Sequence, residues 1–551
     1  MQKDVACTRC IRPVSCQPPR ATRTRGAPSK MAISNDARVD SLQSRGEQPA
    51  KQENLDGAGY ENMQEVELKE VLSADEIEGH VPTMLHGLTY VMNGPAVWDF
   101  KKFTLRHWFD GLGALRKFSF EADGSVLFHA KSMYPARLRT WSEASKADMF
   151  TFGEKRGEGG GSLFEFAKRA FSTIKYSGGD VNVNVNTARI RGKDVLLTDA
   201  PILFEYDLES MERRGRLKLY SEYFEKRIPM GVVGSAHPLV DPETGEYIAI
   251  YQAMGGKHVI ISIPGEKDNK ASVIAEVQVG NNTFCHSFFI TRQYVVLAII
   301  PAYLDVGRMI SRASYVDALR FEASDPSLFY VVDRQNGELK CVYEHDAFFF
   351  YHTVNAFERG DDIVLNVCHY EAMNGLDGLD VENLRSGEVS YPKASLMEYT
   401  LTDVGKRPRA ATGRPRAEAR VVGPVHIDMP CVNDKFRARE YRFAYGISRE
   451  IGETTSLSDR LVKVDRVSGE CVTWKSPFCY PDEPLFVPAS ADARREDDGV
   501  LLSIVHDGAR KQSFLLILDA SSMTELARCY TSAPIPHGFH GQMLPSHNPL
   551  L

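Results

Sequence analysis

The sequence predicts an all-β fold, for which a closed β-propeller is the commonest architecture at this length. Short runs of alternating or β-branched residues recur from about residue 82 to the C-terminus. Turn signals such as "NGP", "DPETGE" and "RQNGE" separate these runs. Helical periodicity is rare, and "GGSLFEFAKRAFSTI" at 161–175 is its clearest instance. Strands therefore dominate the prediction.

The predicted strands alternate with turns along the whole domain. In chain order they are the runs 87–94, 125–133, 181–190, 193–199, 246–254, 257–263, 293–300, 328–334, 362–370, 500–508 and 513–519. Two segments, "GEKRGEGGG" at 153–161 and "GKRPRAATGRPRAEAR" at 405–420, interrupt the pattern and are interpreted as surface insertions. The second is basic and would suit an anionic surface, although a solvated loop is the simpler interpretation.

We expect residues 1–82 to form a disordered N-terminal extension and residues 83–551 to form the propeller domain. The first 33 residues hold one acidic residue, Asp4, among seven basic ones. Such a composition suits an organellar transit peptide, and a merely disordered tail explains it equally well. Residues 34–80 are polar and increasingly acidic, which favours a mobile segment preceding the folded domain.

Composition excludes several classes of function. The chain has 551 residues, a net charge of -7 and a pI near 6.1, whereas a nucleic-acid binder usually presents a basic face. Its longest apolar run, "YVVLAIIPAYL", is broken by Pro301 and is shorter than the roughly 18 residues of a membrane-spanning helix. Peripheral contact with a membrane stays open. The ten cysteines do not show the spacing typical of a disulfide framework. This favours a reduced intracellular compartment (cytoplasm, plastid or mitochondrion) over secretion.

Four of the fifteen histidines share a setting, because each adjoins a strand or a turn with apolar neighbours: His237, His286, His352 and His540. His352 follows "FFFY", so it should be desolvated and neutral. A backbone carbonyl or a neighbouring side chain would satisfy such a histidine if it were alone. A ring of blades could instead point all four at one axis. Spacing does not decide between these possibilities, since any all-β chain with this many histidines offers comparable sets.

The sequence motifs around these histidines are more informative than their spacing. "AHPLVDPETGE", "HSFFITRQYVV", "FYHTVNAFE" and "PHGFHG" occur here in the order and context of the carotenoid cleavage oxygenase family. The sequence resembles that family from about residue 88 to its C-terminal end. Further matching segments are "NGP" (93–95), "HWFDGLGALRKFSF" (107–120), "EYRFAYG" (440–446), "EPLFVPA" (483–489) and "LLSIVHDGARKQSFLLILDASSM" (501–523).

The resemblance implies a seven-bladed β-propeller with a helical and loop cap over its top face and one non-haem Fe(II) on its axis. Carried over residue by residue, the iron ligands are His237, His286, His352 and His540. In "HGFH", residues 537 and 540 would face opposite sides of an extended strand. His540 is the family match, which leaves His537 as a surface residue or one behind the ligands.

The resemblance also implies three carboxylates that orient the ligands. Glu483 in "DEPLFVP" matches directly and should support His540. Asp199 in "TDAP" and Asp428 in "HIDMPCVND" stand where the family commonly has glutamate. By analogy they would serve His286 and His352, through a backbone shift or a water, because each side chain is one methylene shorter. Without the resemblance, each acid would be interpreted as a turn or surface residue.

The implied reaction is dioxygenase chemistry, in which Fe(2+) with O2 as co-substrate cleaves a conjugated C=C bond of a carotenoid or apocarotenoid to carbonyl products. An apolar polyene would be taken from a membrane. "FFFY" (348–351) and "FF" (288–289) are candidate cavity walls, although we expect half or more of these side chains to lie in the propeller core. The alternatives are a retinyl ester isomerase, a stilbene-cleaving enzyme and a catalytically silent lipid-binding propeller. The 150–175 stretch has no "PDPCK"-like segment, which weakens the isomerase assignment.

Overall fold

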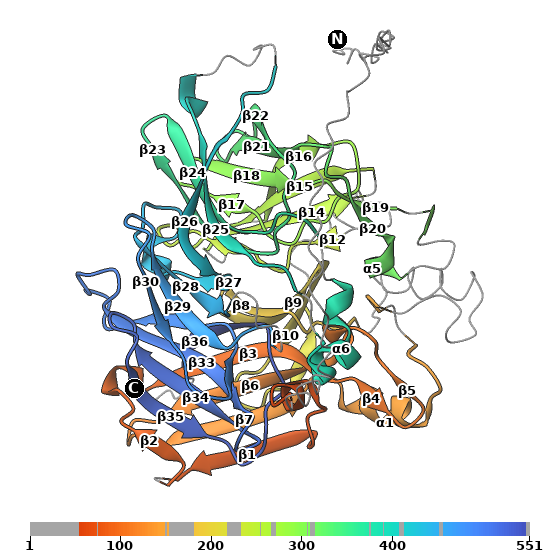
Figure 1. The fold of residues 1–551 in the computed structure, drawn as a ribbon, viewed down its shortest axis with the longest axis vertical. Coiled ribbons are helices and arrows are strands. Elements are labelled where there is room, and N and C mark those ends of the chain that lie inside the picture. The colour runs from red at the N-terminus through yellow and green to blue at the C-terminus, as the bar shows by residue number, and fades with distance from the viewer. Residues whose placement is uncertain are drawn as a thin grey trace, which may run out of the picture. The chain divides into compact units, whose positions relative to one another are not determined.

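Seven antiparallel β-sheets form the blades of a propeller in the computed structural model (Figure 1). This confirms the predicted fold class. The structure describes residues 54–73, 75–148, 151–153, 181–217, 233–253, 255–265, 271–305, 307–308, 314–373, 376–388, 391–406, 413–450 and 456–546. These belong to one compact unit, Glu53–Leu551. Every run predicted as a strand overlaps a strand of a blade.

Blade 1 joins the two ends of the described chain. Its last strand pairs with an early one, so that His540 lies opposite Asn93, and this pairing closes the ring. Red-to-orange and blue ribbons accordingly lie side by side in Figure 1. The strand order is β1 (Glu67–Leu72), β7 (Val126–Ser132), β6 (Leu112–Phe120), β3 (Leu88–Val97) and β36 (His540–Pro545).

Blades 2, 3 and 4 follow in sequence order as meanders of neighbouring strands. Blade 2 contains β8 (Asn186–Ile190), β9 (Lys193–Thr198), β10 (Ala200–Tyr206) and β11 (Arg213–Arg216). Blade 3 contains β12 (Val233–Gly234), β13 (Leu239–Val240), β14 (Tyr247–Ala253), β15 (Lys257–Ile263) and β16 (Ser272–Gln278). Blade 4 contains β17 (Phe289–Ile290), β18 (Tyr294–Ile299), β21 (Ser327–Asp333) and β22 (Leu339–His345).

Blades 5, 6 and 7 complete the ring. Blade 5 contains β23 (Thr353–Arg359), β24 (Asp362–His369), β25 (Ser395–Leu401) and β26 (Glu418–His426). Blade 6 contains β27 (Asp428–Cys431), β28 (Phe443–Ser448), β29 (Arg460–Asp465) and β30 (Cys471–Trp474). Blade 7 contains β31 (Cys479–Pro481), β32 (Leu485–Pro488), β33 (Gly499–Asp507), β34 (Gln512–Asp519), β35 (Glu525–Tyr530) and β2 (Ile77–Gly79).

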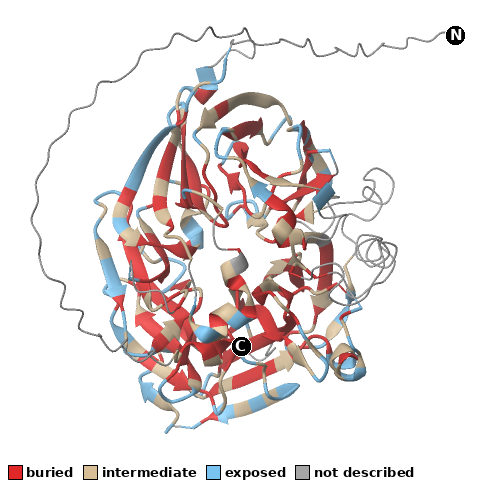
Figure 2. Ribbon diagram, turned by 45° about the vertical axis from the view of Figure 1, so that its right-hand side comes forward, coloured by how far each residue is buried: buried red, intermediate tan, exposed pale blue. Residues whose placement is uncertain are grey.

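The core lies between neighbouring blades. Ile248 and Ile260 of blade 3 pack in one buried cluster with Val295 and Val332 of blade 4. All six residues of β18 are buried, as expected for a strand covered on both faces, whereas exposed residues gather at the outer edges in Figure 2. The apolar run that contains Pro301 is therefore a core strand and its continuation.

Short helices and two hairpins lie outside the blades. They are α1 (Pro135–Glu143), α5 (Tyr315–Ala318), α6 (Val381–Ser386), η1 (Gly57–Tyr60), η2 (Thr83–Leu85), η3 (Trp108–Asp110), η4 (Asp377–Leu379), η5 (Val404–Lys406), η6 (Asp434–Phe436), and the pairs β4 (Asp99–Phe100) with β5 (Phe103–Thr104) and β19 (Ala302–Leu304) with β20 (Leu319–Phe321). Within the described ranges no helix is long and apolar enough to cross a membrane. The predicted helix at 161–175 lies outside the described residues.

The expectation of disorder is wrong for residues 54–73 and 75–82. β1 pairs with β7 and β2 pairs with β35, so residues 67–72 belong to blade 1 and residues 77–79 to blade 7, while residues 57–60 form η1. The polar composition of β1 and β2 has a simple cause, since both are edge strands; in β1, exposed residues alternate with half-buried ones up to the buried Leu72. Residues 1–53 lie outside the described part, and a disordered extension there stays a prediction. The insertion predicted at 405–420 ends earlier, because β26 begins at Glu418.

Candidate metal centre

Four histidines from four blades converge near the propeller axis: His540 from blade 1, His237 from blade 3, His286 from blade 4 and His352 from blade 5. One ring nitrogen of each lies within 4.8 Å of the corresponding nitrogens of the others. In five of the six pairs, the ring centroids are 4.2 to 5.4 Å apart. The Nε2 atoms of His237 and His286 are 2.9 Å apart.

Local structure explains why these side chains point inward. His237 lies in the turn between β12 and β13, and His286 precedes β17. His352 directly precedes β23, and His540 opens β36. Each therefore sits at or just before the start of a strand, and His540 is the one of the four that also takes part in a strand pairing, opposite Asn93.

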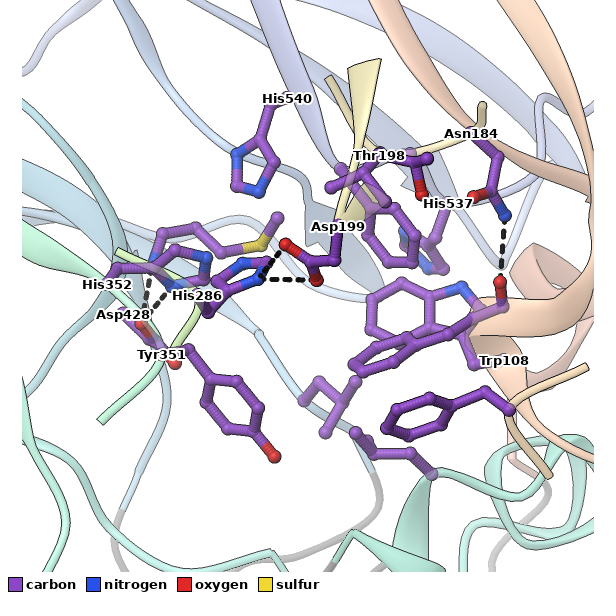
Figure 3. A pocket seen from close by; sticks show the side chains of 18 of the residues that line it. Trp108, Asn184, Thr198, Asp199, His286, Tyr351, His352, Asp428, His537 and His540 are labelled. Carbon is purple, nitrogen blue, oxygen red and sulfur yellow. Dashed lines mark hydrogen bonds and ion pairs between the residues drawn. The ribbon is translucent and has the colours of Figure 1, made fainter. Parts of the chain in front are cut away.

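Three carboxylates hold the outward nitrogens of three of the rings. Asp428 Oδ1 lies 2.7 Å from Nδ1 of His352. The two carboxylate oxygens of Asp199 lie 3.1 and 2.9 Å from Nδ1 of His286 (Figure 3). Glu483 Oε1 lies 2.8 Å from Nδ1 of His540. The structure thus brings together all seven residues that the sequence singled out, in the pairings expected.

These contacts fix how the imidazoles can act. A carboxylate accepts the Nδ1–H proton of each paired ring, so the Nε2 atom facing the axis carries a lone pair. Three such lone pairs, with the fourth ring beside them, form a set of acceptors that a cation would satisfy. Imidazole suits iron, zinc, copper and nickel among the transition metals. The donor set therefore fits a divalent transition-metal ion.

Burial favours the neutral form of three of the four histidines, His237, His352 and His540. Burial lowers the pKa of His237 well below its usual value, and the neighbouring histidines lower it further. Burial also lowers the pKa of His352, and it lowers that of His540 to about 3. These directions agree with the sequence argument that His352 is desolvated and uncharged, the form in which an imidazole can bind a metal.

Besides His352, Asp428 has a hydroxyl partner, Tyr370, that the sequence did not suggest. Burial would raise the pKa of Asp428, but attraction to His352 and hydrogen bonds from His352, Tyr370 and the Met429 N–H outweigh it and hold the pKa at about 2. The Tyr370 hydroxyl donates to Oδ2, the oxygen that His352 leaves free. Tyr370 is merely the last residue of a predicted strand, so no local pattern marks it.

An apolar cavity of about 390 Å³ opens beside the histidines. Aromatic rings form much of the wall shown in Figure 3, where Tyr351 lies near His286 and Trp108 lies farther from the histidines. α5 and η4 each contribute a side chain, Tyr315 and Leu379, which agrees with a cap of short helices and loops. Of the six aromatic residues suggested as walls, Tyr351 lines this cavity, whereas Phe348, Phe349, Phe350, Phe288 and Phe289 are buried in the core.

His537 is neither on the surface nor on the far side of a strand. β36 begins only at His540, so residue 537 lies in irregular backbone and the alternation argument does not apply. Its ring lines the same cavity and bridges two buried carboxylates, Asp482 at 2.6 Å and Asp56 at 2.8 Å. Asp56 was missed because the sequence around it has the composition of a mobile segment.

Fold and site together define a β-propeller with a four-histidine centre beside an apolar cavity. The sequence model of the retinal pigment epithelial membrane protein family matches residues 61–545. The chain therefore belongs to this family, the carotenoid cleavage oxygenases, as its motifs predicted.

Individual relatives agree with this assignment. The mitochondrial carotenoid-cleaving dioxygenase of Mustela putorius furo is 27% identical over 529 residues, covering 86% of this chain and 94% of the relative. The chloroplastic carotenoid cleavage dioxygenase 8 of Arabidopsis thaliana is 28% identical over 500 residues, covering 85% and 83%. Among solved structures, cobalt-substituted Synechocystis apocarotenoid oxygenase superposes with a TM-score of 0.74 at 22% identity, covering 89% of this chain and 98% of that one. The last comparison supports the fold.

Proposed function

We propose that this protein is a non-haem Fe(II) dioxygenase that cleaves a conjugated C=C bond of a carotenoid or apocarotenoid. His237, His286, His352 and His540 would hold one ferrous ion, with Asp199, Asp428 and Glu483 orienting three of them. The observation that supports this most is the convergence of four imidazoles, two buried and two half-buried, at the wall of an apolar aromatic cavity, with three of them held by carboxylates. The cavity suits a polyene and the imidazoles suit iron.

The charges around the site favour this assignment. Four neutral imidazoles leave the double positive charge of the ion uncancelled, while three carboxylates stand directly behind the rings. In the low dielectric of a buried site, that arrangement compensates the cation without taking up its open coordination positions. When bound, iron would supply dioxygen activation.

The remaining tasks belong to the protein. The carboxylates fix the tautomer and direction of three of the four imidazoles, and the aromatic walls hold the polyene and exclude water. Overall, one C=C bond and one O2 molecule become two C=O groups, with one oxygen atom in each product. Atoms and electrons balance without an added reductant or an acid–base group, which agrees with a cavity whose wall is largely apolar.

Turnover of polyenes with and without oxygen tests the proposal. The iron-loaded protein is incubated with a carotenoid, an apocarotenoid, a retinyl ester and a stilbenoid, and products are identified by mass. We expect oxygen-dependent carbonyl fragments from the carotenoid or the apocarotenoid. Oxygen-independent products of unchanged mass would indicate an isomerase, fragments from the stilbenoid alone a stilbene cleaver, and no conversion at all a lipid-binding propeller.

We also propose that the substrate is taken from a membrane that the protein contacts peripherally, because long polyenes partition into lipid. The mitochondrial and chloroplastic relatives make an organelle the natural location. A fusion of residues 1–53 to a fluorescent protein tests the transit-peptide interpretation, since it should be imported into an organelle. A diffuse cytoplasmic signal would count against it.

A further inference from the structure

Two carboxylate–histidine pairs lie one after the other along the same two chain segments. Asp482 and Glu483 are neighbours in sequence, and His537 and His540 both belong to "HGFH". Asp482 binds Nδ1 of His537 at 2.6 Å, and Glu483 binds Nδ1 of His540 at 2.8 Å. The first pair therefore stands beside a pair that we place at the metal.

The two pairs are also alike in the glycine that follows each histidine, because its N–H donates to the carboxylate of the pair. The N–H of Gly538 donates to Asp482 Oδ2 at 2.9 Å. The N–H of Gly541 donates to Glu483 Oε2 at 3.1 Å. Each unit thus consists of an acid that accepts from an imidazole Nδ1 and from the backbone of the next glycine, and the two units tie the 481–483 turn to the 536–541 segment.

The units differ at the outer nitrogen of the imidazole. Nε2 of His540 belongs to the converging set, whereas Nε2 of His537 meets Asp56 Oδ1 at 2.8 Å. The second oxygen of Asp56 accepts from the Ser456 hydroxyl at 2.6 Å. Asp56, Asp482 and His537 are 1%, 5% and 6% exposed, so the bridge is buried and its charges depend on one another.

The N-terminal segment 54–60 is built around the His537 ring. The Gly59 carbonyl accepts from the His537 N–H at 2.8 Å. The Tyr60 ring lies 4.8 Å from the imidazole, centroid to centroid. A Cβ at residue 59 would come within 2.4 Å of His537 Nε2, so glycine is required for this approach. Asp56 and Tyr60 in turn line the cavity.

We propose that His537 is a positioning residue of the metal centre. Through Asp482 it holds the 481–483 turn in the register that brings Glu483 to His540, and through Asp56 it ties one wall of the cavity to that turn. This inference rests on the proposed function, because it assumes that His540 binds the metal. Removing the ring lets the turn shift, which loosens His540; removing only Asp56 loosens mainly the wall.

Metal affinity in the full chain tests this role. His537→Phe keeps a ring and removes the bridge, and Asp56→Asn keeps the shape of the outer carboxylate and removes its charge. Affinity for Fe(II) and Co(II) is measured by chelator competition, the Co(II) absorption spectrum reports the ligand geometry, and limited proteolysis reports release of segment 54–60. His129→Phe is the matched control, since His129 is a buried histidine bonded to Glu67 at 2.8 Å in blade 1 and does not line the cavity.

We expect His537→Phe to lose metal affinity about tenfold, the low end for residues that orient ligands, and to shift the cobalt spectrum. Asp56→Asn should keep most of the affinity and release the N-terminal segment to protease. His129→Phe should change neither. Unchanged affinity and spectrum in folded His537→Phe would overturn the inference; if that variant does not fold, a protected N-terminal segment in Asp56→Asn would overturn it. His352→Ala distinguishes failure of this inference from failure of the proposed function, because retained metal in that variant would refute the proposed function itself.

Discussion

Asp199 and Asp428 reach their histidines directly, although each is one methylene shorter than the glutamate expected from the family. Neither needs a bridging water, since the shortest contacts are 2.9 and 2.7 Å. The two sites differ in room, however. The Asp199 side chain is 36% exposed, whereas that of Asp428 is 9% exposed and packs against Tyr370.

Lengthening the two acids should therefore have unequal effects. Asp199→Glu has space to adjust and should keep metal affinity and melting temperature close to wild type. Asp428→Glu adds a methylene to a filled site, and overpacking of this kind costs about 1–3 kcal/mol. Thermal unfolding and chelator competition measure both. Equal behaviour of the two variants would show that the packing around Asp428 is not restrictive.

Tyr370 should support the centre through Asp428. Tyr370→Phe removes the hydroxyl that occupies Oδ2, which leaves the carboxylate held on one side only. We expect a loss of metal affinity that is smaller than the roughly 10–100-fold loss for Asp428→Ala. Tyr399→Phe is the control, because its hydroxyl binds His369, away from the cavity. The same loss in both tyrosine variants would indicate a general effect on blade 5.

The charge on His537 gives stability a defined pH dependence. Burial would lower its pKa, but attraction to Asp482 and Asp56 outweighs this and raises it to about 10. A raised pKa stabilises the fold fully below the unfolded value of about 6.5, and the stabilisation is lost as pH rises towards 10. The difference in melting temperature between wild type and His537→Phe should thus shrink between pH 6.5 and 10. A difference that grows over this range would contradict a charged His537.

At the scale of elements, hydrophobic patterning predicts the central strands of the blades but not the edge strand β1 or segment 54–60. The runs that became β14, β15 and β18 are buried along almost their whole length and stand out in any window. β1 is polar because one side faces solvent, and segment 54–60 is rich in glycine and polar residues although none of it is exposed, so composition alone made both resemble a linker. Their order comes from pairing with β7 and from contacts to His537, which are distant in sequence.

Segment 54–63 should act as a unit of the cavity wall. A chain that starts at residue 64 keeps β1 but lacks Asp56 and Tyr60, whereas a chain that starts at residue 54 keeps both. The shorter chain should melt at a lower temperature and bind a carotenoid more weakly, because one wall of the cavity is gone. Quenching of tryptophan fluorescence measures binding, since Trp108 lies 5.7 Å from Tyr60. Equal polyene affinities would show that the segment is not part of the binding surface.

At the scale of the whole molecule, every blade contributes one group to the centre. Blades 1, 3, 4 and 5 supply histidines, and blades 2, 6 and 7 supply Asp199, Asp428 and Glu483. This explains why spacing alone could not reveal the site. His352 and Asp428 are 76 residues apart, and only ring closure by β3 and β36 brings His540 to its neighbours. The family motifs carried that long-range information, and they carried none about Tyr370, Asp56 or Asp482.

Iron content is the measurement that tests the central claim most directly. Purified, iron-reconstituted wild-type protein should contain close to one iron per chain, and His237→Ala, His286→Ala, His352→Ala and His540→Ala should each lose most of it while remaining folded. His369→Ala, which removes a buried histidine of blade 5 that does not line the cavity, should retain it. Full iron retention in all four variants of the converging set would contradict the claim that these histidines hold the metal.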